Sequence, residues 1–555
     1  MNVSHDFPWA PWDEATFARA RAEGKPILLH IGATWCHWCH VMDEDTYTHV
    51  GVTTLIRDHF IAIRVDTDLR PDINERYNQG GWPTLAVLDG EGEVLLGRTY
   101  VPGPELVHLL RGYTHGQSRW SVTPERPRPP AARPVAIGAI SEAVADAYDR
   151  RYGGFGEVEK FPHIGILEWL LDRAARTAGA DAGRGPARDM PAREMLSRTL
   201  DAMAGWDLYD HEEGGFFRYA TQDDWGSPHT EKLLDDNARL LAVYTRAWAL
   251  EPRPLWRQAA EAALAWAIRV LWDDAADGFA ASQDADSGYY ALPRARRGTA
   301  PSVDPTIQAG WNGWMIVALC RAAAAFDRPG LLGLARRLGL RLRRDRLEGD
   351  GRVVRAGPVA GLLEDQVALA EGWMTLGAAT GDATWFDAAA GSLTWARDHL
   401  GAPGGGCYDR VPGGFGRLRH GQRPLPANAA LAVATHRLAA YTGDAAWADF
   451  ARATATAALT EAEGWGHMAA PAAAAWERVT AEPVVVKVHA APALMSRWTA
   501  QPQPDILALA VSGATAQRLG LAPGQALACT RRACARPAVD DAGVVAAIRA
   551  LTATR

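Results

Sequence analysis

Glycine-rich turns recur along the chain from residue 136 onward, and they constrain its fold more than any other feature of the sequence. Between them lie long stretches rich in Ala, Leu, Arg and Trp, with apolar residues at helical spacing. Six marker glycines lie about 60 residues apart: Gly154, Gly215, Gly278, Gly351, Gly405 and Gly464. An interval of that length holds two helices and their connections.

A single helical hairpin cannot bury its apolar face, so six consecutive hairpins must pack on one another. We expect them to close into a ring, an (α/α)6 toroid spanning residues 136–500. An open α-solenoid is the alternative, because equal spacing of the turns is compatible with both.

The first 117 residues have a different pattern, in which short apolar runs alternate with helical segments. The predicted element order is βαβαββα after an N-terminal helix. The strands are expected at residues 26–32, 61–66, 83–88 and 93–98, and the helices at 13–22, 36–60, 71–77 and 104–113.

These patterns divide the chain into four parts. A Pro- and Arg-rich stretch is typical of a linker, and the last part becomes strand-like again near Ile506. The predicted parts are an α/β domain at 1–117, a linker at 118–135, the all-α toroid at 136–500 and a C-terminal extension at 501–555.

Composition excludes several functional classes. The net charge of −7 and the pI near 6.2 leave no basic surface for nucleic acid or for an anionic membrane. No uncharged apolar run reaches 18 residues, and the N-terminus has neither a basic segment nor an apolar one. Six cysteines are too few for a secreted disulfide scaffold, so we expect a cytoplasmic protein.

The segment ATWCHWCHVM, residues 33–42, holds the most chemically specific motif. A C-x-x-C-H cluster can be a redox dithiol, half of a zinc site or a c-type haem attachment. Haem attachment requires export, and zinc requires two more ligands, which Cys529 and Cys534 could supply. That C-terminal pair could instead exchange electrons with the first pair, or form a local disulfide. The two remaining cysteines, Cys320 and Cys407, are expected to be buried packing residues.

The dithiol interpretation fits the local pattern. Cys36 follows a predicted strand and begins a helix, where the positive end of the helix dipole stabilises a thiolate. Cys39 lies one turn later, close enough to attack a mixed disulfide on Cys36. A protonated His37 would add positive charge beside Cys36. Pro83, at the start of a later strand, is placed for a cis peptide bond.

Two segments resemble thioredoxins: Trp35-Cys36-His37-Trp38-Cys39 resembles their W-C-x-x-C motif, and Gly81-Trp82-Pro83-Thr84 resembles their cis-proline segment. The resemblance implies that Cys36 is the nucleophile, that Trp35 precedes it, that Cys39 is the resolving thiol and that Pro83 is the cis-proline. The sequence departs from thioredoxins at His30, which stands where they carry a buried acid. A thioredoxin-like fold that has lost its activity is the alternative.

Further motifs extend a resemblance along nearly the whole chain: Lys160-Phe161-Pro162, the segment 228–234 (PHTEKLL), Asp284-Ala285-Asp286-Ser287, Trp311-Asn312-Gly313 and Leu363-Glu364-Asp365. With the dithiol segment they resemble the YyaL-like family of thioredoxin-domain-containing proteins, which includes spermatogenesis-associated members. The resemblance implies a thioredoxin-like domain joined to an (α/α)6 barrel similar to N-acylglucosamine 2-epimerases and six-hairpin glycosidases.

A second candidate site is expected at one mouth of the toroid, where acids and aromatic residues gather beside the glycine turns. Paired carboxylates there would suit sugar hydrolysis, and His with Glu would suit epimerisation. His229, Lys232 and Asp236 are predicted to share one helix face. The alternative is that single acids are helix caps or ion-pair partners. The candidate substrate-binding residues are His229, Lys232, Asp236, Asp284, Asp286, Trp311, Asn312, Glu364 and Asp365.

The sequence therefore predicts a thiol–disulfide oxidoreductase module fused to a barrel that binds a carbohydrate-like ligand or a protein client. One alternative is a sugar-active enzyme, an epimerase or glycosidase, whose first domain is a redox sensor or scaffold. Another is a binding protein without catalysis. The expected partners are a protein disulfide or thiol and a small carbohydrate-like molecule. No cofactor, metal, nucleic acid or membrane partner is expected, and the oligomeric state stays open.

Overall fold

The computed structural model describes residues 7–114, 133–177 and 190–553. All but the last three residues of the predicted linker, 118–135, lie outside them. The chain forms two compact units. The first contains residues 1–129 and two short segments from later in the chain, 283–286 and 409–422, and the second contains the rest.

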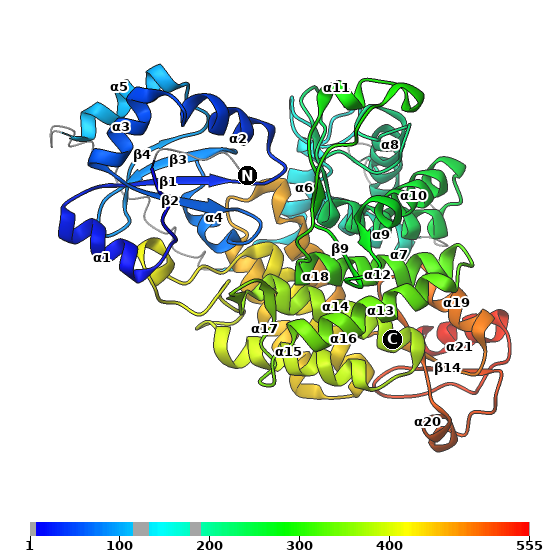
Figure 1. Cartoon of the computed structure of the whole chain (residues 1–555). Helices are drawn as coiled ribbons and strands as arrows, with labels where there is room; N and C mark the ends of the chain where they lie inside the picture. Colours follow the sequence, from blue (N-terminus) through cyan, green and yellow to red (C-terminus); the bar gives the residue numbers. More distant parts are fainter. Residues whose placement is uncertain (1–6, 115–132, 178–189, 554–555) are drawn as a thin grey trace. The chain divides into compact units, whose positions relative to one another are not determined.

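The first unit is built on a four-stranded sheet with helices before and between its strands (Figure 1). Its elements run in the predicted order: α1 (Glu14–Glu23), β1 (Ile27–Gly32), α2 (His37–Val41), η1 (Met42–Thr46), α3 (Val50–His59), β2 (Ile61–Asp66), α4 (Pro71–Tyr77), β3 (Thr84–Leu88), β4 (Val94–Arg98) and α5 (Gly103–Thr114). The strand order is β2-β1-β3-β4. β1 pairs with β2 in parallel and with β3 in antiparallel register.

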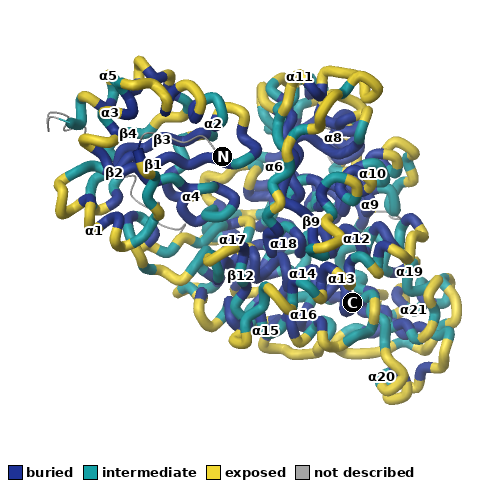
Figure 2. Tube along the Cα trace, viewed as in Figure 1, coloured by how far each residue is buried: buried dark blue, intermediate teal, exposed yellow. Residues whose placement is uncertain are grey.

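The sheet is covered on both faces, so β1 and β3 are buried along their whole length (Figure 2). Residues at alternate positions of β1 point to opposite faces, as the pleat requires. Ile27, Leu29 and Ile31 pack with α1 and α4. Leu28 packs on the other side with α3 and α5. This double covering explains why the sequence of β1 is a continuous apolar run.

One sequence prediction for this unit is wrong. A single helix was expected over 36–60, but the chain forms α2, a π-helical turn and then α3. α3 has its own start, because the His49 side chain accepts the Gly51 N–H at its N-terminus. The break separates the short helix α2 from the surface helix α3.

Segment 409–422 belongs to the first unit through contacts with α4 and with the β3–β4 turn. Asp409 accepts two hydrogen bonds from the buried Arg76 guanidinium, at 2.6 and 3.0 Å. Phe415 stacks on Phe17 of α1, with ring centres 5.5 Å apart. A segment from between two helices of the barrel thus completes the core of the N-terminal fold.

The second unit contains a ring of six inner helices, each packed against the next. In ring order they are α7 (Ile164–Thr177), α9 (Leu234–Leu250), α12 (Ala309–Ala325), α14 (Leu363–Thr380), α16 (Leu425–Thr442) and α18 (Ala470–Thr480). The ring is closed because α18 packs against α7. The predicted toroid is therefore confirmed, and the open solenoid is excluded.

A second layer of helices packs outside this ring. They are α6 (Ile137–Ala147), α8 (Ala192–Gly205), α10 (Pro254–Trp266), α13 (Gly330–Arg346), α15 (Thr384–Leu400) and α17 (Ala445–Glu461). Inner and outer helices alternate along the chain, which gives six helical pairs among the described residues. None of the described helices is both long and apolar enough to cross a membrane.

Short elements occupy the connections between these helices. They are β5 (Tyr219–Ala220), β6 (Pro228–His229), β7 (Lys232–Leu233), η2 (Ala267–Leu271), β8 (Trp272–Asp273), β9 (Gly278–Phe279), β10 (Ser282–Gln283), α11 (Ser287–Tyr290), η3 (Arg294–Arg296), β11 (Val303–Asp304), β12 (Val354–Ala356), β13 (Val359–Ala360), η4 (Gly416–Arg419) and η5 (Gly466–Ala469).

The glycine turns are explained by close approach of the backbone. Gly214 has a φ of 82°, and a Cβ there would lie 2.4 Å from the carbonyl oxygen of Ala262 on α10. An L-residue with a side chain would be strained in that conformation and would also clash with the outer helix.

The chain ends in a three-stranded sheet with order β15-β14-β16. Its elements are β14 (Val484–His489), α19 (Pro492–Ala500), β15 (Ile506–Ala510), α20 (Gly513–Arg518), β16 (Gln525–Cys529) and α21 (Asp541–Ala553). β14 pairs with β15 in parallel and with β16 in antiparallel register, which repeats the arrangement of β1 with β2 and β3. The sheet begins before residue 501, the boundary expected from sequence.

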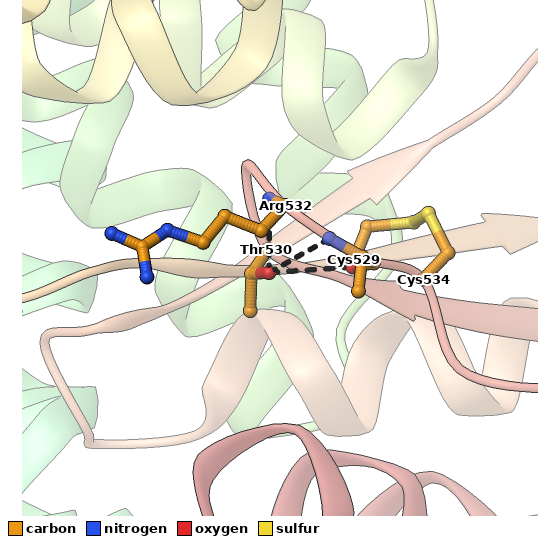
Figure 3. Close-up of a disulfide and its surroundings, with 5 residues drawn as sticks. Cys529, Thr530, Arg532 and Cys534 are labelled. Carbon is orange, nitrogen blue, oxygen red and sulfur yellow. Dashed lines mark hydrogen bonds between the residues drawn. A yellow bond between two sulfur atoms is a disulfide. The ribbon is translucent and has the colours of Figure 1, made fainter. Parts of the chain in front are cut away.

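Cys529 and Cys534 are joined by a disulfide across a tight turn after β16 (Figure 3). Inside the turn the Thr530 N–H donates to the Ala533 carbonyl at 2.8 Å, and Thr530 Oγ1 accepts the Arg532 N–H at 3.2 Å. Of the three roles considered for this pair, the structure has the local disulfide. Cys320 and Cys407 are buried in the barrel, as predicted.

Candidate functional site

Cys36 and Cys39 lie at the junction of β1 and α2 in the first unit. Cys36 is the N-cap residue of α2, and its Sγ accepts the Cys39 N–H at 3.3 Å. Both thiols are reduced and buried. A sulfur that caps a helix sits where N–H groups without intrahelical partners stabilise negative charge.

Aromatic side chains surround the dithiol. Trp35 donates its indole N–H to the buried Asp68 carboxylate at 2.7 Å, which fixes the ring beside Cys36. Its ring also contacts that of Trp82 edge-on, with centres 5.8 Å apart. The Trp82–Pro83 peptide bond is cis, which confirms the prediction from the sequence.

The two thiols differ in environment. Burial, followed by the neighbouring Cys36, raises the pKa of Cys39 well above its ordinary value. Cys39 is completely buried and therefore stays protonated near neutral pH. A resolving role would require a nearby group to take its proton.

His30 on β1 is one group near that thiol, and the buried Asp43 carboxylate is another. A Cβ on Gly32 would lie 2.8 Å from His30 Nε2 and 3.2 Å from Cys39 Sγ, so the imidazole and the thiol face the same glycine. His30 Nδ1 is 3.0 Å from the Tyr47 hydroxyl. Nε2 is thus the ring nitrogen on the side of Gly32 and Cys39, and a neutral imidazole carries an acceptor on one of its two ring nitrogens.

The other histidines of the motif lie nearer the surface. His37 is exposed and packs edge-on against Trp38, which is itself exposed. His40 Nε2 is bonded to the Thr34 carbonyl at 2.8 Å, and its Nδ1 lies 3.8 Å from the Asp284 carboxylate. Asp284 and Asp286 were predicted at the barrel mouth, but the structure groups them with the dithiol unit.

The second unit encloses a cavity of about 340 Å³ inside the ring of helices. All six inner helices contribute to its wall. On α12 the lining residues Trp311, Trp314, Val317 and Arg321 follow one face of the helix at three- and four-residue spacing. The N-terminal ends of the six helices form one end of the cavity. At the other end lie their C-terminal parts, together with residues 498–508 of the C-terminal sheet region.

The N-terminal end of the cavity carries carboxylates, arginines and an aromatic ring. Of the residues predicted from sequence, Trp311, Glu364 and Asp365 line it. Asp365 is fully buried and accepts the Arg355 guanidinium at 3.0 Å and the Gly310 N–H at 2.9 Å. Glu364 is half exposed and pairs with the same guanidinium. Both acids are therefore ion-pair partners that also face the cavity.

Two carboxyl groups in the first turn of α9 have raised pKa values. Burial, and then the neighbouring Asp235, raises the pKa of Asp236 to about 7. Burial likewise raises the pKa of Asp235, which lines the cavity. Asp235 Oδ1 is buried and has no hydrogen-bond partner among the described residues. A carboxyl group that stays protonated near neutral pH is suited to act as a general acid.

Three more of the predicted residues lie in the connecting segments or hold them in place: His229, Lys232 and Asn312. His229 is in β6, Lys232 in β7 and Asp236 in α9, so the prediction that they share a helix face is wrong. His229 stacks on Tyr219 with ring centres 4.6 Å apart. Lys232 is fully buried and pairs with Asp210 at 2.6 Å. Asn312 is buried and holds the Phe279 backbone through two hydrogen bonds.

A comparison of the first unit with known families agrees with this geometry. Residues 2–112 match the family model Thioredox_DsbH, described as a protein of unknown function, DUF255. The first unit is a thioredoxin-like domain. The match covers the dithiol, the cis-proline and both layers of helices on the sheet.

The curated relatives extend beyond the thioredoxin-like domain. Spermatogenesis-associated protein 20 of Mus musculus is 30% identical over 317 residues, and its Homo sapiens counterpart is 30% identical over 318. Each match covers 50% of this chain and 39% of the relative. The matched part is thus less than half the length of these relatives.

Solved structures include proteins similar to each part. Cellobiose 2-epimerase from Bacillus thermoamylovorans has 10% identity and a TM-score of 0.44, covering 56% of this chain and 82% of that one. A DsbH oxidoreductase has 19% identity and a TM-score of 0.18, covering 20% of this chain and 87% of that one. The ring of helix contacts, rather than these similarities, defines the barrel.

Several cavity residues were missed from the sequence. Asp235, next to the predicted Asp236, is the acid that lines the cavity. The sequence held a usable signal, because an acid pair opens an amphipathic helix there. The arginines at the far end of the cavity were also missed: Arg246, Arg321, Arg437 and Arg478.

Proposed function

We propose that the thioredoxin-like domain is a thiol–disulfide oxidoreductase and that the barrel binds a small carbohydrate-like ligand. The observation that carries the first part is the Cys36 sulfur at the N-cap of α2, one turn before a buried second thiol. The Cys36 thiolate attacks a client disulfide, forms a mixed disulfide and releases one client thiolate. Cys39 then attacks Cys36 Sγ, which releases the reduced client and leaves a Cys36–Cys39 disulfide. An added dithiol such as dithiothreitol restores the reduced pair.

His30 supports the second half of this reaction as the acceptor of the Cys39 proton. We expect His30→Leu to slow the resolving step about tenfold or more, because general-base catalysis typically contributes 10²–10⁴-fold. Rapid-quench kinetics would show accumulation of the Cys36 mixed disulfide while the rate of its formation stays unchanged. His59→Leu, at the C-terminal end of α3, is the matched control. An equal loss in both steps would mean that His30 only supports the fold.

The cavity and its aromatic and carboxylate lining support the second part of the proposal. A sugar offers hydroxyls for the Glu364 and Asp365 carboxylates and an apolar ring face for Trp311. A sugar-active enzyme is the second candidate, and the raised pKa values of Asp235 and Asp236 favour it. In that case Asp235→Asn would abolish turnover of a sugar substrate but keep its binding.

Trp311→Ala tests the ligand site. Loss of one aromatic contact is worth about 0.5–1.5 kcal/mol, so sugar affinity should fall by a factor of about 2 to 13. Calorimetric titration with a panel of mono- and disaccharides measures it. Trp465→Ala, which removes an exposed tryptophan from the α17–η5 connection, should leave affinity unchanged. Equal affinities of the wild type and Trp311→Ala would remove Trp311 from the site.

A further inference from the structure

The C-terminal end of the barrel cavity lies opposite the end that Glu364 and Asp365 line. It carries more positive than negative charge. Four inner helices each place an arginine on the cavity wall near their C-terminal ends: Arg246 on α9, Arg321 on α12, Arg437 on α16 and Arg478 on α18. Two carboxylates, Asp172 and Glu371, pair with members of this group. The group of four guanidiniums, called here the arginine cluster, therefore exceeds its carboxylate partners by two charges.

The pairing within the arginine cluster is uneven. Asp172 accepts Arg246 at 2.8 Å and Arg478 at 2.5 and 2.9 Å, while Glu371 pairs with Arg437. Neither Asp172 nor Glu371 forms an ion pair with Arg321. Within residues 7–114, 133–177 and 190–553, no hydrogen bond or ion pair involves Arg321. Its five N–H donors therefore remain available on the cavity wall.

The surroundings of Arg321 make its charge costly. Burial, and then the neighbouring Arg246, Arg437 and Arg478, lowers the pKa of its guanidinium to about 9. The other ionisable groups nearby do not change this excess. Glu168, which acts to raise the pKa of Arg321, pairs with Arg239 at 3.7 Å. Asp505 and Glu477 pair with Arg176 and Arg173, and burial lowers the pKa of His436 to about 4, so that it is neutral at pH 7.

Two more donors lie at the same end of the cavity. Trp498 Nε1 and Thr499 Oγ1 of the C-terminal sheet region are buried and have no hydrogen-bond partner among the described residues, and both residues line the cavity. The partial negative charge of the helix C-termini favours arginines here, but it supplies no acceptor to Arg321. This end of the cavity thus offers excess positive charge and hydrogen-bond donors of Arg321, Trp498 and Thr499 that no described residue accepts.

We propose that the arginine cluster binds the dianionic phosphate group of a small phosphorylated carbohydrate, whose sugar part extends toward Trp311. The charge excess of two matches a phosphate monoester, and guanidinium forks match its oxygens. This inference rests on the proposed function of the barrel for the sugar part. The anion site stands separately on the arginine cluster.

The test uses the full-length reduced protein at constant ionic strength, with three probes: inorganic phosphate, glucose 6-phosphate and glucose. Calorimetric affinity and the thermal unfolding midpoint are measured for the wild type, Arg321→Gln and Arg336→Gln. Arg336 is exposed on the outer helix α13, so the last variant makes the same chemical change outside the cavity. We expect both phosphates to bind the wild type and Arg336→Gln, and Arg321→Gln to lose at least tenfold in affinity.

The three probes distinguish the sources of the anion. Glucose 6-phosphate that binds tenfold or more tightly than inorganic phosphate identifies a phosphorylated sugar. Equal affinities for the two phosphates identify inorganic phosphate as the ligand. The anion site would then stand, and the sugar part of the proposed ligand would be withdrawn. The inference is overturned if neither phosphate binds the wild type below millimolar concentration, if Arg321→Gln binds them equally well, or if glucose binds as tightly as glucose 6-phosphate. That last result would still leave the proposed sugar site intact.

A second variant protects the test against misfolding. Arg321 is partly exposed on the cavity wall, and Arg321→Met replaces this cation with an apolar chain of similar length, so the ligand-free protein should unfold at a temperature no lower than that of the wild type. Phosphate should raise the midpoint of the wild type but not that of Arg321→Met. A lower midpoint for ligand-free Arg321→Met would show that Arg321 has a structural partner and would contradict the proposal.

Discussion

Cys36→Ser is expected to remove the disulfide reductase activity of the protein, by at least about 10³-fold, since loss of the nucleophile in comparable enzymes costs that much or more. Reduction of insulin with dithiothreitol as the electron donor measures it. Cys39→Ser should instead accumulate a mixed disulfide between Cys36 and the client, because the thiol that releases the client is missing. Mass spectrometry of the non-reduced complex identifies that species.

The control for both variants is Cys320→Ser. Cys320 is buried in the barrel, and burial raises the pKa of its thiol to about 12, so it does not take part in exchange at neutral pH. Full activity of Cys36→Ser, or a wild type without activity, would contradict the oxidoreductase proposal. The thioredoxin-like domain would then be a scaffold or a sensor for the barrel.

Asp172→Asn should cause a large loss of barrel stability, about 3–5 kcal/mol, as expected when one partner is removed from a buried ion-pair group. Asp172 is fully buried on α7, between Arg246 of α9 and Arg478 of α18. The substitution would leave the buried Arg246 and the partly buried Arg478 without their carboxylate. Urea denaturation followed by tryptophan fluorescence measures the change in the barrel transition.

The same carboxylate predicts a pH dependence. Burial opposes the charge of Asp172, but Arg478 and Arg246 outweigh it and lower the pKa to about 2. Because this pKa lies below the ordinary value of about 3.8, the contribution is fully present above about pH 4 and is lost as the pH falls through 2. The stability of Asp172→Asn should therefore change less between pH 4 and pH 2 than that of the wild type.

Asp398→Asn is the matched control, since Asp398 is half exposed and pairs with Arg397 on the surface of α15. Exposed ion pairs contribute about 0–1 kcal/mol, so this variant should stay within that range. A loss below about 1 kcal/mol for Asp172→Asn would mean that the two arginines find other partners.

The fold was largely predictable because its signals are local and repeated. The glycine turns mark positions where the backbone passes close to an outer helix, as at Gly214, and they recur once per hairpin. The dithiol was predictable because a strand, a sulfur and a helix start follow one another directly. Neither inference needed contacts between distant residues, apart from closure of the ring.

The cavity was harder to predict because its residues are distant in sequence and face it from different helices. Lys232 and Asn312 carry the expected chemistry, but they hold the connecting segments of the barrel in place. Arg321 was overlooked because one arginine on a helix has no recognisable pattern. Its significance comes from Arg246, Arg437 and Arg478, which the closed ring brings around it.

Closure of the ring by α18 against α7 also sets the order in which this chain can fold during synthesis. The helix that opens the ring is made early, but its last neighbour is completed only at Thr480. At about 5–20 residues per second, α7 waits on the order of 15–60 s for that neighbour. Throughout this interval the apolar flank of α7 that α18 will cover remains accessible to chaperones. A domain whose neighbouring elements are consecutive in sequence would cover such a flank sooner after its synthesis.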